Sequence, residues 1–305
     1  CELSRGLGDV YKRQKKHRKI NRTNPGTQAM MQTIRIGIST CPNDTFAFHG
    51  LMDRRVDWRG LDFKIELHDI QELNNRIINQ YFNVAKASFY AAALLADKYV
   101  VLSSGSALGF GVGPLLLSSS NGTLPANSKQ LTLCPGAQTT ATLLYDMFYP
   151  RTTRVEHVVF SDIMPQLQRN EADFGVCIHE GRFTWEASDL FLVEDLGARW
   201  ETETQCPLPL GGIIAQSSLG ADVISQVQHV IRDSLLYGLA NPAAPLSTMR
   251  AYAQELDDSV LMQHVKLYVN DWTVDLGSVG RKALHELSRR ANLANGGKSK
   301  LQVFE

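Results

Sequence analysis

The stretch Ser39-Thr40-Cys41-Pro42-Asn43-Asp44-Thr45-Phe46 joins a strand to a helix, and it decides the fold class. Residues 34–38 before it form an apolar, strand-like segment. Pro42 is tolerated in the first turn of a helix, and Asn43 and Asp44 can cap free backbone N–H groups. A strand that leads into a helix N-terminus places N–H donors and the positive end of the helix dipole at one edge of an open sheet. A small anion can bind there, which makes Asn43 a candidate substrate contact.

Strand and helix patterns alternate along the rest of the chain from Gln32. Strands are predicted over residues 63–67, 82–87, 100–103, 112–118, 130–133, 155–160, 174–178, 191–193 and 211–215. Helices are predicted over residues 70–80, 89–98, 139–149, 163–170, 223–239, 246–256, 259–269 and 279–292. Alternating units of this kind predict an α/β protein, with a parallel or mixed sheet covered by helices.

Two polar or proline-rich segments divide the alternating units into two sets. Residues 119–127 form a turn-rich stretch, and a second linker is predicted near Pro207–Leu210. We therefore expect a first lobe from residues 31–120 and 215–295, a second lobe from residues 121–214, and a loose tail over 296–305. In open α/β sheets ligands bind beyond the carboxyl ends of the strands, so the expected site is a central cleft between the lobes.

The charge of the chain is unevenly distributed. Residues 1–30 hold eight Lys or Arg against Glu2 and Asp9, and the remaining residues carry a net charge of about −6. This argues against a nucleic-acid-binding body. The basic segment lacks the apolar core of a secretory signal, and we expect a disordered or artefactual extension, with the true start at Met30 or Met31.

The five cysteines are scattered, with no CxxC pair. Together with the missing export signal, this predicts reduced thiols and a cytoplasmic protein. Cys41 has two interpretations: a small packing residue, or a nucleophile at a helix N-terminus, where the pKa of a thiol falls. No apolar run approaches the roughly 20 residues that span a membrane, so we expect no membrane partner. The net negative charge after residue 30 likewise predicts no nucleic-acid partner. The amphipathic helices after Gly220 are packing elements, or alternatively the contact of a homodimer.

His179 is the candidate catalytic residue. It ends the apolar strand 174–178, and its imidazole can act as a general base near neutral pH. Arg182 follows closely and can bind a substrate carboxylate with both guanidinium nitrogens, although a salt bridge between surfaces or lobes explains it equally well. We therefore expect a small-molecule carboxylate as the substrate.

Two further strand-to-helix turns carry candidate substrate-binding residues. Lys86, Ala87 and Ser88 end one strand and offer a cation, a hydroxyl and backbone donors. Thr140 and Ala141 open a helix with hydroxyl and N–H donors, although an ordinary threonine cap explains them too. Phosphate-binding glycine loops, zinc motifs and clustered metal ligands are missing from the sequence, and we expect no cofactor and no metal.

Several of these segments occur in the same order in a known family. The stretch 39–46, Lys86-Ala87-Ser88, residues 109–114, Thr139-Thr140-Ala141 and residues 178–184 together resemble the 1,4-dihydroxy-6-naphthoate synthases of the futalosine route to menaquinone. Residues 207–212 and 268–270 extend the likeness, which covers roughly residues 33–293. The chain has Ala87 where the family often has Leu, and Gly181 where it often has Ser, which affects the expected shape of the pocket.

This resemblance implies a fold like that of type II periplasmic binding proteins, used as a cytoplasmic lyase. The implied reaction converts cyclic de-hypoxanthinylfutalosine to 1,4-dihydroxy-6-naphthoate and releases dihydroxyacetone. The proton acceptor of the family matches His179, and its substrate-contacting segments match residues 86–88 and 140–141. Two alternatives stay open: a solute-binding protein of the same fold, and the chorismate dehydratase of the same pathway.

Overall fold

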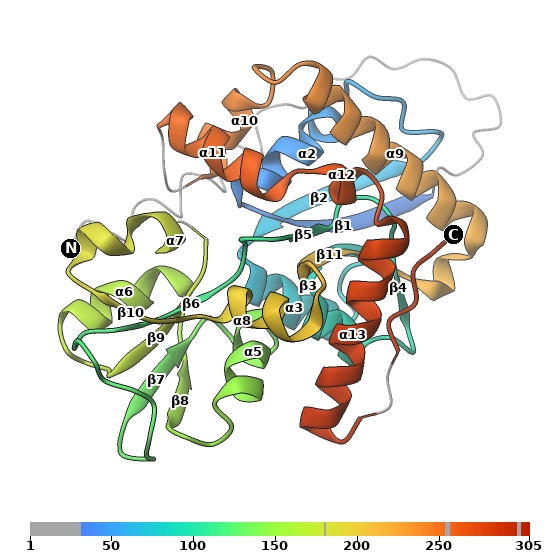
Figure 1. Cartoon of the computed structure of the whole chain (residues 1–305). Helices are drawn as coiled ribbons and strands as arrows, with labels where there is room; N and C mark the ends of the chain where they lie inside the picture. The colour runs from blue at the N-terminus through green and yellow to red at the C-terminus, as the bar shows by residue number, and fades with distance from the viewer. Residues whose placement is uncertain (1–31, 180, 254–256, 298–299) are drawn as a thin grey trace, which may run out of the picture. The chain divides into compact units, whose positions relative to one another are not determined.

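The computed structural model describes residues 32–179, 181–253, 257–297 and 300–305. The basic extension over residues 1–30 and Glu180 lie outside the described residues. Within them the chain forms two β-sheets, and helices pack against both (Figure 1).

The first sheet has six strands within the described residues, in the order β2-β1-β3-β11-β4, and β5 also pairs with β11. These strands are β1 (Thr33–Ser39), β2 (Asp62–His68), β3 (Val84–Ser88), β4 (Tyr99–Val101), β5 (Ala107–Gly109) and β11 (Leu208–Gln216). β1 is parallel to β2 and β3, whereas β11 is antiparallel to β3, with Ser88 opposite Gly211. The carboxyl ends of β1, β2 and β3 therefore lie along one edge.

Helices cover both faces of the first sheet. They are α2 (Pro42–Met52), α3 (Ile70–Ile78), α4 (Phe89–Leu94), α9 (Ala221–Ala240), α10 (Leu246–Tyr252), α11 (Asp258–Tyr268), α12 (Asp271–Val274) and α13 (Gly277–Asn295). Figure 1 shows α2, α9, α10 and α11 on one side, and α3 and α13 on the other. Successive side chains of a strand point to opposite faces, so Val84 packs with the first group and Ala85 with the second.

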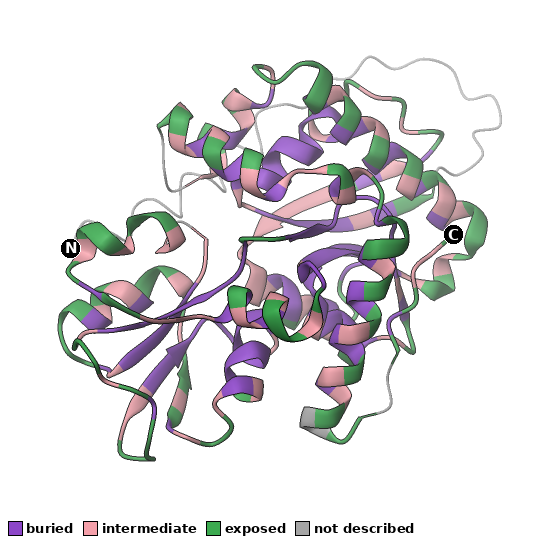
Figure 2. Ribbon diagram, in the orientation of Figure 1, coloured by how far each residue is buried: buried purple, intermediate pink, exposed green. Residues whose placement is uncertain are grey.

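The second sheet has five strands among the described residues, in the order β10-β6-β9-β7-β8. Its elements are β6 (Leu115–Ser118), β7 (Leu131–Cys134), α5 (Thr140–Phe148), β8 (Arg154–His157), α6 (Phe160–Gln168), β9 (Phe174–Cys177), α7 (Gly181–Thr184), the 3₁₀ turn η1 (Trp185–Ser188), β10 (Phe191–Asp195) and α8 (Leu196–Thr204). β7, β8 and β9 are parallel, so the segments that follow β7 and β9 leave the same edge. Buried residues run through the central strands of both sheets, whereas the edge strands β8 and β10 of the second sheet contain none (Figure 2).

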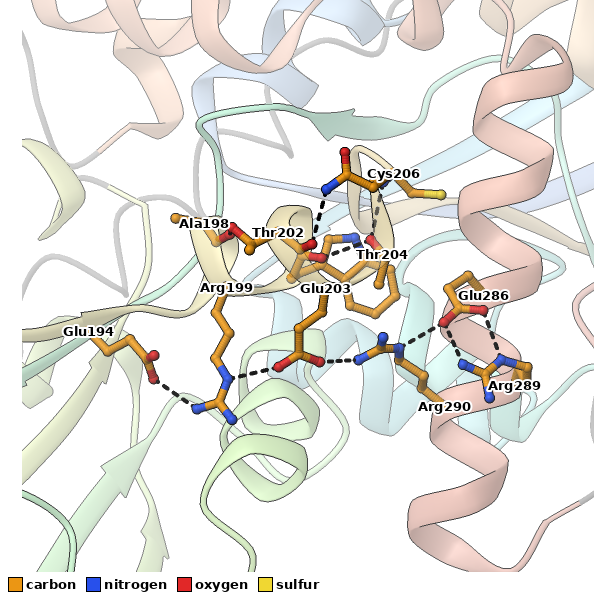
Figure 3. A network of polar contacts seen from close by, with 12 residues as sticks. Glu194, Ala198, Arg199, Thr202, Glu203, Thr204, Cys206, Glu286, Arg289 and Arg290 are labelled. Atoms are coloured by element: carbon orange, nitrogen blue, oxygen red, sulfur yellow. Dashed lines mark hydrogen bonds and ion pairs between the residues drawn. The ribbon is translucent and has the colours of Figure 1, made fainter.

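The two sheets share apolar and ionic contacts. The largest core cluster contains Ala85 and Phe89 of the first sheet region together with Phe174 and Val176 of β9. A chain of ion pairs runs from β10 through α8 to α13 (Figure 3), and its side chains are Glu194, Arg199, Glu203, Arg290, Glu286 and Arg289. The ion pair from Arg290 to Glu203, at 2.6 Å, joins α13 to α8.

The lobe boundaries stay a prediction. β6 precedes residue 120 and pairs in the second sheet, and the chain is already back in the first sheet at Leu208. The chain passes from α8 to the first sheet near the predicted linker at Pro207–Leu210, but residues 208–210 already belong to β11. Pro209 fits there because the pairing of β11 with β5 is irregular between Pro209 and Gly211, where a missing N–H donor is tolerated.

Other differences concern short elements. The sequence did not predict β5 or α8, and the predicted helix over 89–98 ends at Leu94. α8 contains Gly197 and the β-branched residues Thr202 and Thr204, which lower its helix propensity. It forms because Asp195 caps it and Trp200 is buried. Tertiary contacts here override local propensity.

Candidate active site

Segments from both sheets surround a cavity of about 700 Å³, its opening to solvent included. The turn after β1, the end of β3, the start of α5, the segment after β9 and the end of α11 all contribute to its lining. Six of the eight residues predicted from the sequence line it: Asn43, Lys86, Ser88, Thr140, Ala141 and His179. The ends of strands from both sheets therefore meet at one cavity, as expected. The turn before Thr140 follows β7, and His179 follows β9, so both belong to the second sheet.

His179 lies two residues beyond β9 and is half-buried. Its backbone has a φ of 54°, in the left-handed region that non-glycine residues rarely adopt. The ring of Phe160 packs edge-on against the imidazole, with centroids 4.8 Å apart. The thiol of Cys41, on the first sheet side, lies 3.5 Å from His179 Nδ1 and 3.7 Å from Nε2. The candidate base is thus held where the two sheets meet.

Cys41 immediately precedes α2 and is half-buried. It lines the cavity, and its thiol contacts His179 instead of packing in an apolar core. Neither a nucleophilic role nor a packing role describes this geometry by itself. The contact instead makes Cys41 part of the surroundings of the candidate base.

A chain of buried polar groups forms the floor of the cavity. Lys86 Nζ donates to Asp44 Oδ1 at 2.7 Å, and the two side chains are 7% and 4% exposed. Asn43 Nδ2 donates to the same oxygen at 3.0 Å. Asn43 Oδ1 lies 3.0 Å from His264 Nε2. Removing one partner of a buried ion pair strands the other charge, so these groups hold one another in place.

The predicted capping role of Asn43 and Asp44 is wrong. The N-cap of α2 is Cys41, which makes no side-chain capping bond, and Pro42 begins the helix. The side chains of Asn43 and Asp44 bond to each other, to Lys86 and to His264, because a buried cation and a buried imidazole compete for them.

Asn74 of α3 fixes Ser88 by two hydrogen bonds. Its Nδ2 donates to Ser88 Oγ at 3.1 Å, and its Oδ1 accepts from Ser88 N at 3.0 Å. Asn74 and Ser88 are both buried. Since Ser88 Oγ accepts from Asn74 and no described residue accepts the hydroxyl hydrogen, Ser88 can donate it to a molecule in the cavity.

The start of α5 offers backbone donors. Thr139 is the N-cap, and its hydroxyl accepts from Thr142 N at 3.2 Å. The Thr140 hydroxyl donates to Leu210 O at 2.8 Å, so its hydrogen is already used inside the protein. The first N–H groups of a helix have no acceptor within the helix, and Thr140 and Ala141 both line the cavity. The start of this helix therefore offers backbone amides that can bind an anion.

Ala87 and Arg182 do not line the cavity. Ala87 points to the opposite face of β3 from Lys86 and Ser88 and is fully buried in the core. Arg182 donates to Asp195 at 2.7 Å and to Gly113 O at 3.0 Å, which is the salt-bridge alternative raised by the sequence. A role for either side chain in substrate binding stays a prediction, without support from this geometry.

Sequence reasoning missed two cavity residues on α11. His264 and Tyr268 lie one helical turn apart, their rings 4.6 Å from centroid to centroid, and both line the cavity. The His264 ring also stacks on His179, at 6.2 Å and 18°. Burial, together with the nearby His179 and Lys86, lowers the pKa of His264 to about 3. The spacing of four between these residues in a predicted helix was the available signal.

The part of the chain that the structure describes has no group of three or more His, Cys, Asp or Glu side chains suited to a metal ion. Among the same residues, no helix is both long and apolar enough to cross a bilayer.

Known proteins resemble the chain along most of its length. A sequence model of a menaquinone biosynthesis family matches residues 34–293. A 1,4-dihydroxy-6-naphthoate synthase of Thermus thermophilus is 40% identical over 261 residues, which cover 86% of this chain and 94% of that protein. A synthase of the same name from Streptomyces coelicolor is 35% identical over 266 residues, 85% and 93% of the two chains. The chain belongs to this family.

Solved structures confirm the fold of this menaquinone biosynthesis family member. A crystal structure of a protein from Archaeoglobus fulgidus superposes with a TM-score of 0.79 at 29% identity, covering 87% of this chain and 98% of that one. The periplasmic aliphatic sulphonate binding protein of Escherichia coli gives a TM-score of 0.58 at 8% identity, over 88% and 90% of the chains. The predicted periplasmic-binding-protein-like α/β fold is confirmed, and the protein is an enzyme with a role in menaquinone biosynthesis.

Proposed function

We propose that the protein is a carbon–carbon lyase that converts cyclic de-hypoxanthinylfutalosine to 1,4-dihydroxy-6-naphthoate and dihydroxyacetone. The observation that carries this proposal is the half-buried imidazole of His179, which borders the same cavity as the Lys86–Asp44 pair and the start of α5. The family resemblance supplies the substrate and the reaction. The geometry supports the proposal because a candidate base and candidate donors line the same cavity.

His179 is the proposed proton acceptor. Transfer of an acidic C–H proton of the substrate to its imidazole starts an elimination, the bond to the three-carbon fragment breaks, and formation of the aromatic ring provides the driving force. The contacts with Phe160 and Cys41 keep the ring at the cavity and so reduce the entropy lost in reaching the reactive geometry.

The remaining groups orient the substrate. We assign its carboxylate to the backbone N–H groups of Thr140 and Ala141, where the dipole of α5 favours an anion. The Ser88 hydroxyl, fixed by Asn74, donates to an oxygen that gains negative charge during the reaction. The charges of Lys86 and Asp44 neutralise each other at 2.7 Å, so the pair shapes the cavity more than it attracts the anion.

The test is incubation of the full chain with cyclic de-hypoxanthinylfutalosine, with mass spectrometry of the products. We expect dihydroxynaphthoate to form without added cofactor. His179→Gln should abolish turnover and retain substrate binding. The matched control is His157→Gln, which changes an exposed histidine of the same sheet outside the cavity and should leave turnover unchanged. Unaltered substrate, or turnover of chorismate instead, would contradict the proposal, as would normal turnover by His179→Gln.

A further inference from the structure

The two ring nitrogens of His264 have different surroundings. Nε2 lies 3.0 Å from Asn43 Oδ1, whereas Nδ1 is buried and has no hydrogen-bond partner among the described residues. The ring is 2% exposed and lines the cavity. Buried polar atoms in native proteins are almost always paired, because an unpaired one costs free energy. An occupant of the cavity can supply the missing partner.

The polar chain fixes which nitrogen carries the hydrogen. Lys86 is a donor only and the Asp44 carboxylate an acceptor only, so the Asn43 amide must turn its NH₂ group toward Asp44. Its carbonyl oxygen then faces His264, and Nε2 must donate to it. Nδ1 is therefore left with a lone pair and is an acceptor.

The ring also stays neutral at physiological pH. Its burial is the main cause of a pKa of about 3, and the nearby His179 and Lys86 side chains lower it further. Nδ1 therefore cannot become a donor under these conditions. A carboxylate oxygen next to this lone pair would be repelled, whereas a hydroxyl group would be bound.

We propose that His264 is a substrate-binding residue whose Nδ1 accepts a hydrogen bond from a substrate hydroxyl group. Because the His264 ring stacks on that of His179 at 6.2 Å, this hydroxyl lies within a few bonds of the carbon that loses its proton. His264 thereby selects a hydroxylated carbon skeleton at the reacting end, while α5 binds the carboxylate. This inference rests on the function proposed above and adds a specificity-determining contact to it.

The first experiment determines the tautomer without any turnover. ¹⁵N NMR of the histidine side chains of the full chain should show His264 with a protonated Nε2 and an unprotonated Nδ1 at neutral pH. A protonated Nδ1 would overturn the inference. Cyclic de-hypoxanthinylfutalosine is then added to the His179→Gln variant, in which turnover is blocked, and the Nδ1 resonance should shift in the direction of an accepted hydrogen bond.

This titration separates the two proposals. Shifts of the Thr140 and Ala141 amides without a shift of His264 Nδ1 mean that the substrate binds but its hydroxyl does not reach His264. That result overturns the inference and keeps the proposed function. No shift at either place, together with no turnover by the natural sequence, overturns both.

The second experiment compares two amide variants of His264. Gln can retain the donor to Asn43 but has no acceptor at the position of Nδ1, whereas Asn can place an oxygen near Nδ1 but loses the donor to Asn43. We expect His264→Gln to lower kcat/KM by about tenfold, mainly through KM, and His264→Asn to remain within about threefold of the natural enzyme. A merely structural histidine would give the reverse order, which overturns the inference. If both variants fold poorly, the NMR experiment decides.

Discussion

Acid is expected to destabilise the protein through His264, and His264→Gln should remove this effect. The native ring is 2% exposed and has a pKa of about 3, compared with an ordinary value of 6.5. Unfolding exposes the ring to water, where it takes up a proton near its ordinary pKa. Between these two values the unfolded chain holds a proton that the native protein does not, so stability falls as the pH falls.

The size of the effect follows from the shift. Each pH unit within this window is worth about 1.4 kcal/mol for one proton. From about pH 7 to about pH 5 the natural protein should therefore lose about 2 kcal/mol of its free energy of unfolding through His264. Gln does not titrate, so between the same two pH values His264→Gln should lose about 2 kcal/mol less of its free energy of unfolding than the natural protein. Lost packing lowers the stability of the variant equally at every pH and does not change this difference.

The assay is urea denaturation of the full chain at closely spaced pH values. One continuous core cluster includes residues of both sheets, which favours a single transition, and coincident fluorescence and circular dichroism curves would establish it. His264→Asn is the matched control, since it also removes the titrating ring and should give the same flattened slope with a different offset. Parallel curves for the natural protein and both variants would refute the reasoning, because they would mean that the native ring takes up a proton like the unfolded one.

Two other predictions concern groups that hold the cavity together. Lys86→Met leaves the buried Asp44 carboxylate without its cation and should lower the free energy of unfolding by about 3–5 kcal/mol. The double variant with Asp44→Asn should recover most of this loss. Urea denaturation measures both variants, and additive losses would contradict the prediction. Asn74→Ala removes both hydrogen bonds that fix Ser88 and should lower the free energy of unfolding by about 1–3 kcal/mol. It should also raise KM for cyclic de-hypoxanthinylfutalosine. An unchanged KM would show that the Ser88 hydroxyl does not bind the substrate.

Local sequence signals predicted the main elements of the fold well. The apolar alternation of residues 34–38 and the proline at 42 correspond to β1 and the start of α2. The apolar run that ends before His179 is β9, whose carboxyl end borders the cavity. These elements are determined by residues that lie close together in the sequence. For the same reason the sequence could place strand ends, and with them six of the predicted cavity residues.

Contacts between distant segments were beyond such reasoning. α8 forms because Trp200 finds a buried position, although its glycine and threonine residues lower its helix propensity. The hydrogen bond between Asn43 and His264 joins residues 221 positions apart, and the helical spacing of His264 and Tyr268 does not by itself reveal this partner. The capping prediction for Asn43 and Asp44 is wrong for the same reason. These side chains bond to buried partners from distant segments, Lys86 and His264, instead of to the nearby backbone.

The site is therefore a product of the meeting of two sheets. His179 follows β9 of the second sheet, and two of the groups that contact it, Cys41 and His264, come from segments that pack on the first. Neither sheet alone places a base beside both a thiol and an acceptor nitrogen. A change that shifts one sheet relative to the other would separate His179 from Cys41 and His264, and a large shift would also disturb the core cluster that the two sheets share. We therefore expect loss of the ion pair between Glu203 of α8 and Arg290 of α13, which lies outside that core cluster, to lower kcat with little effect on the free energy of unfolding.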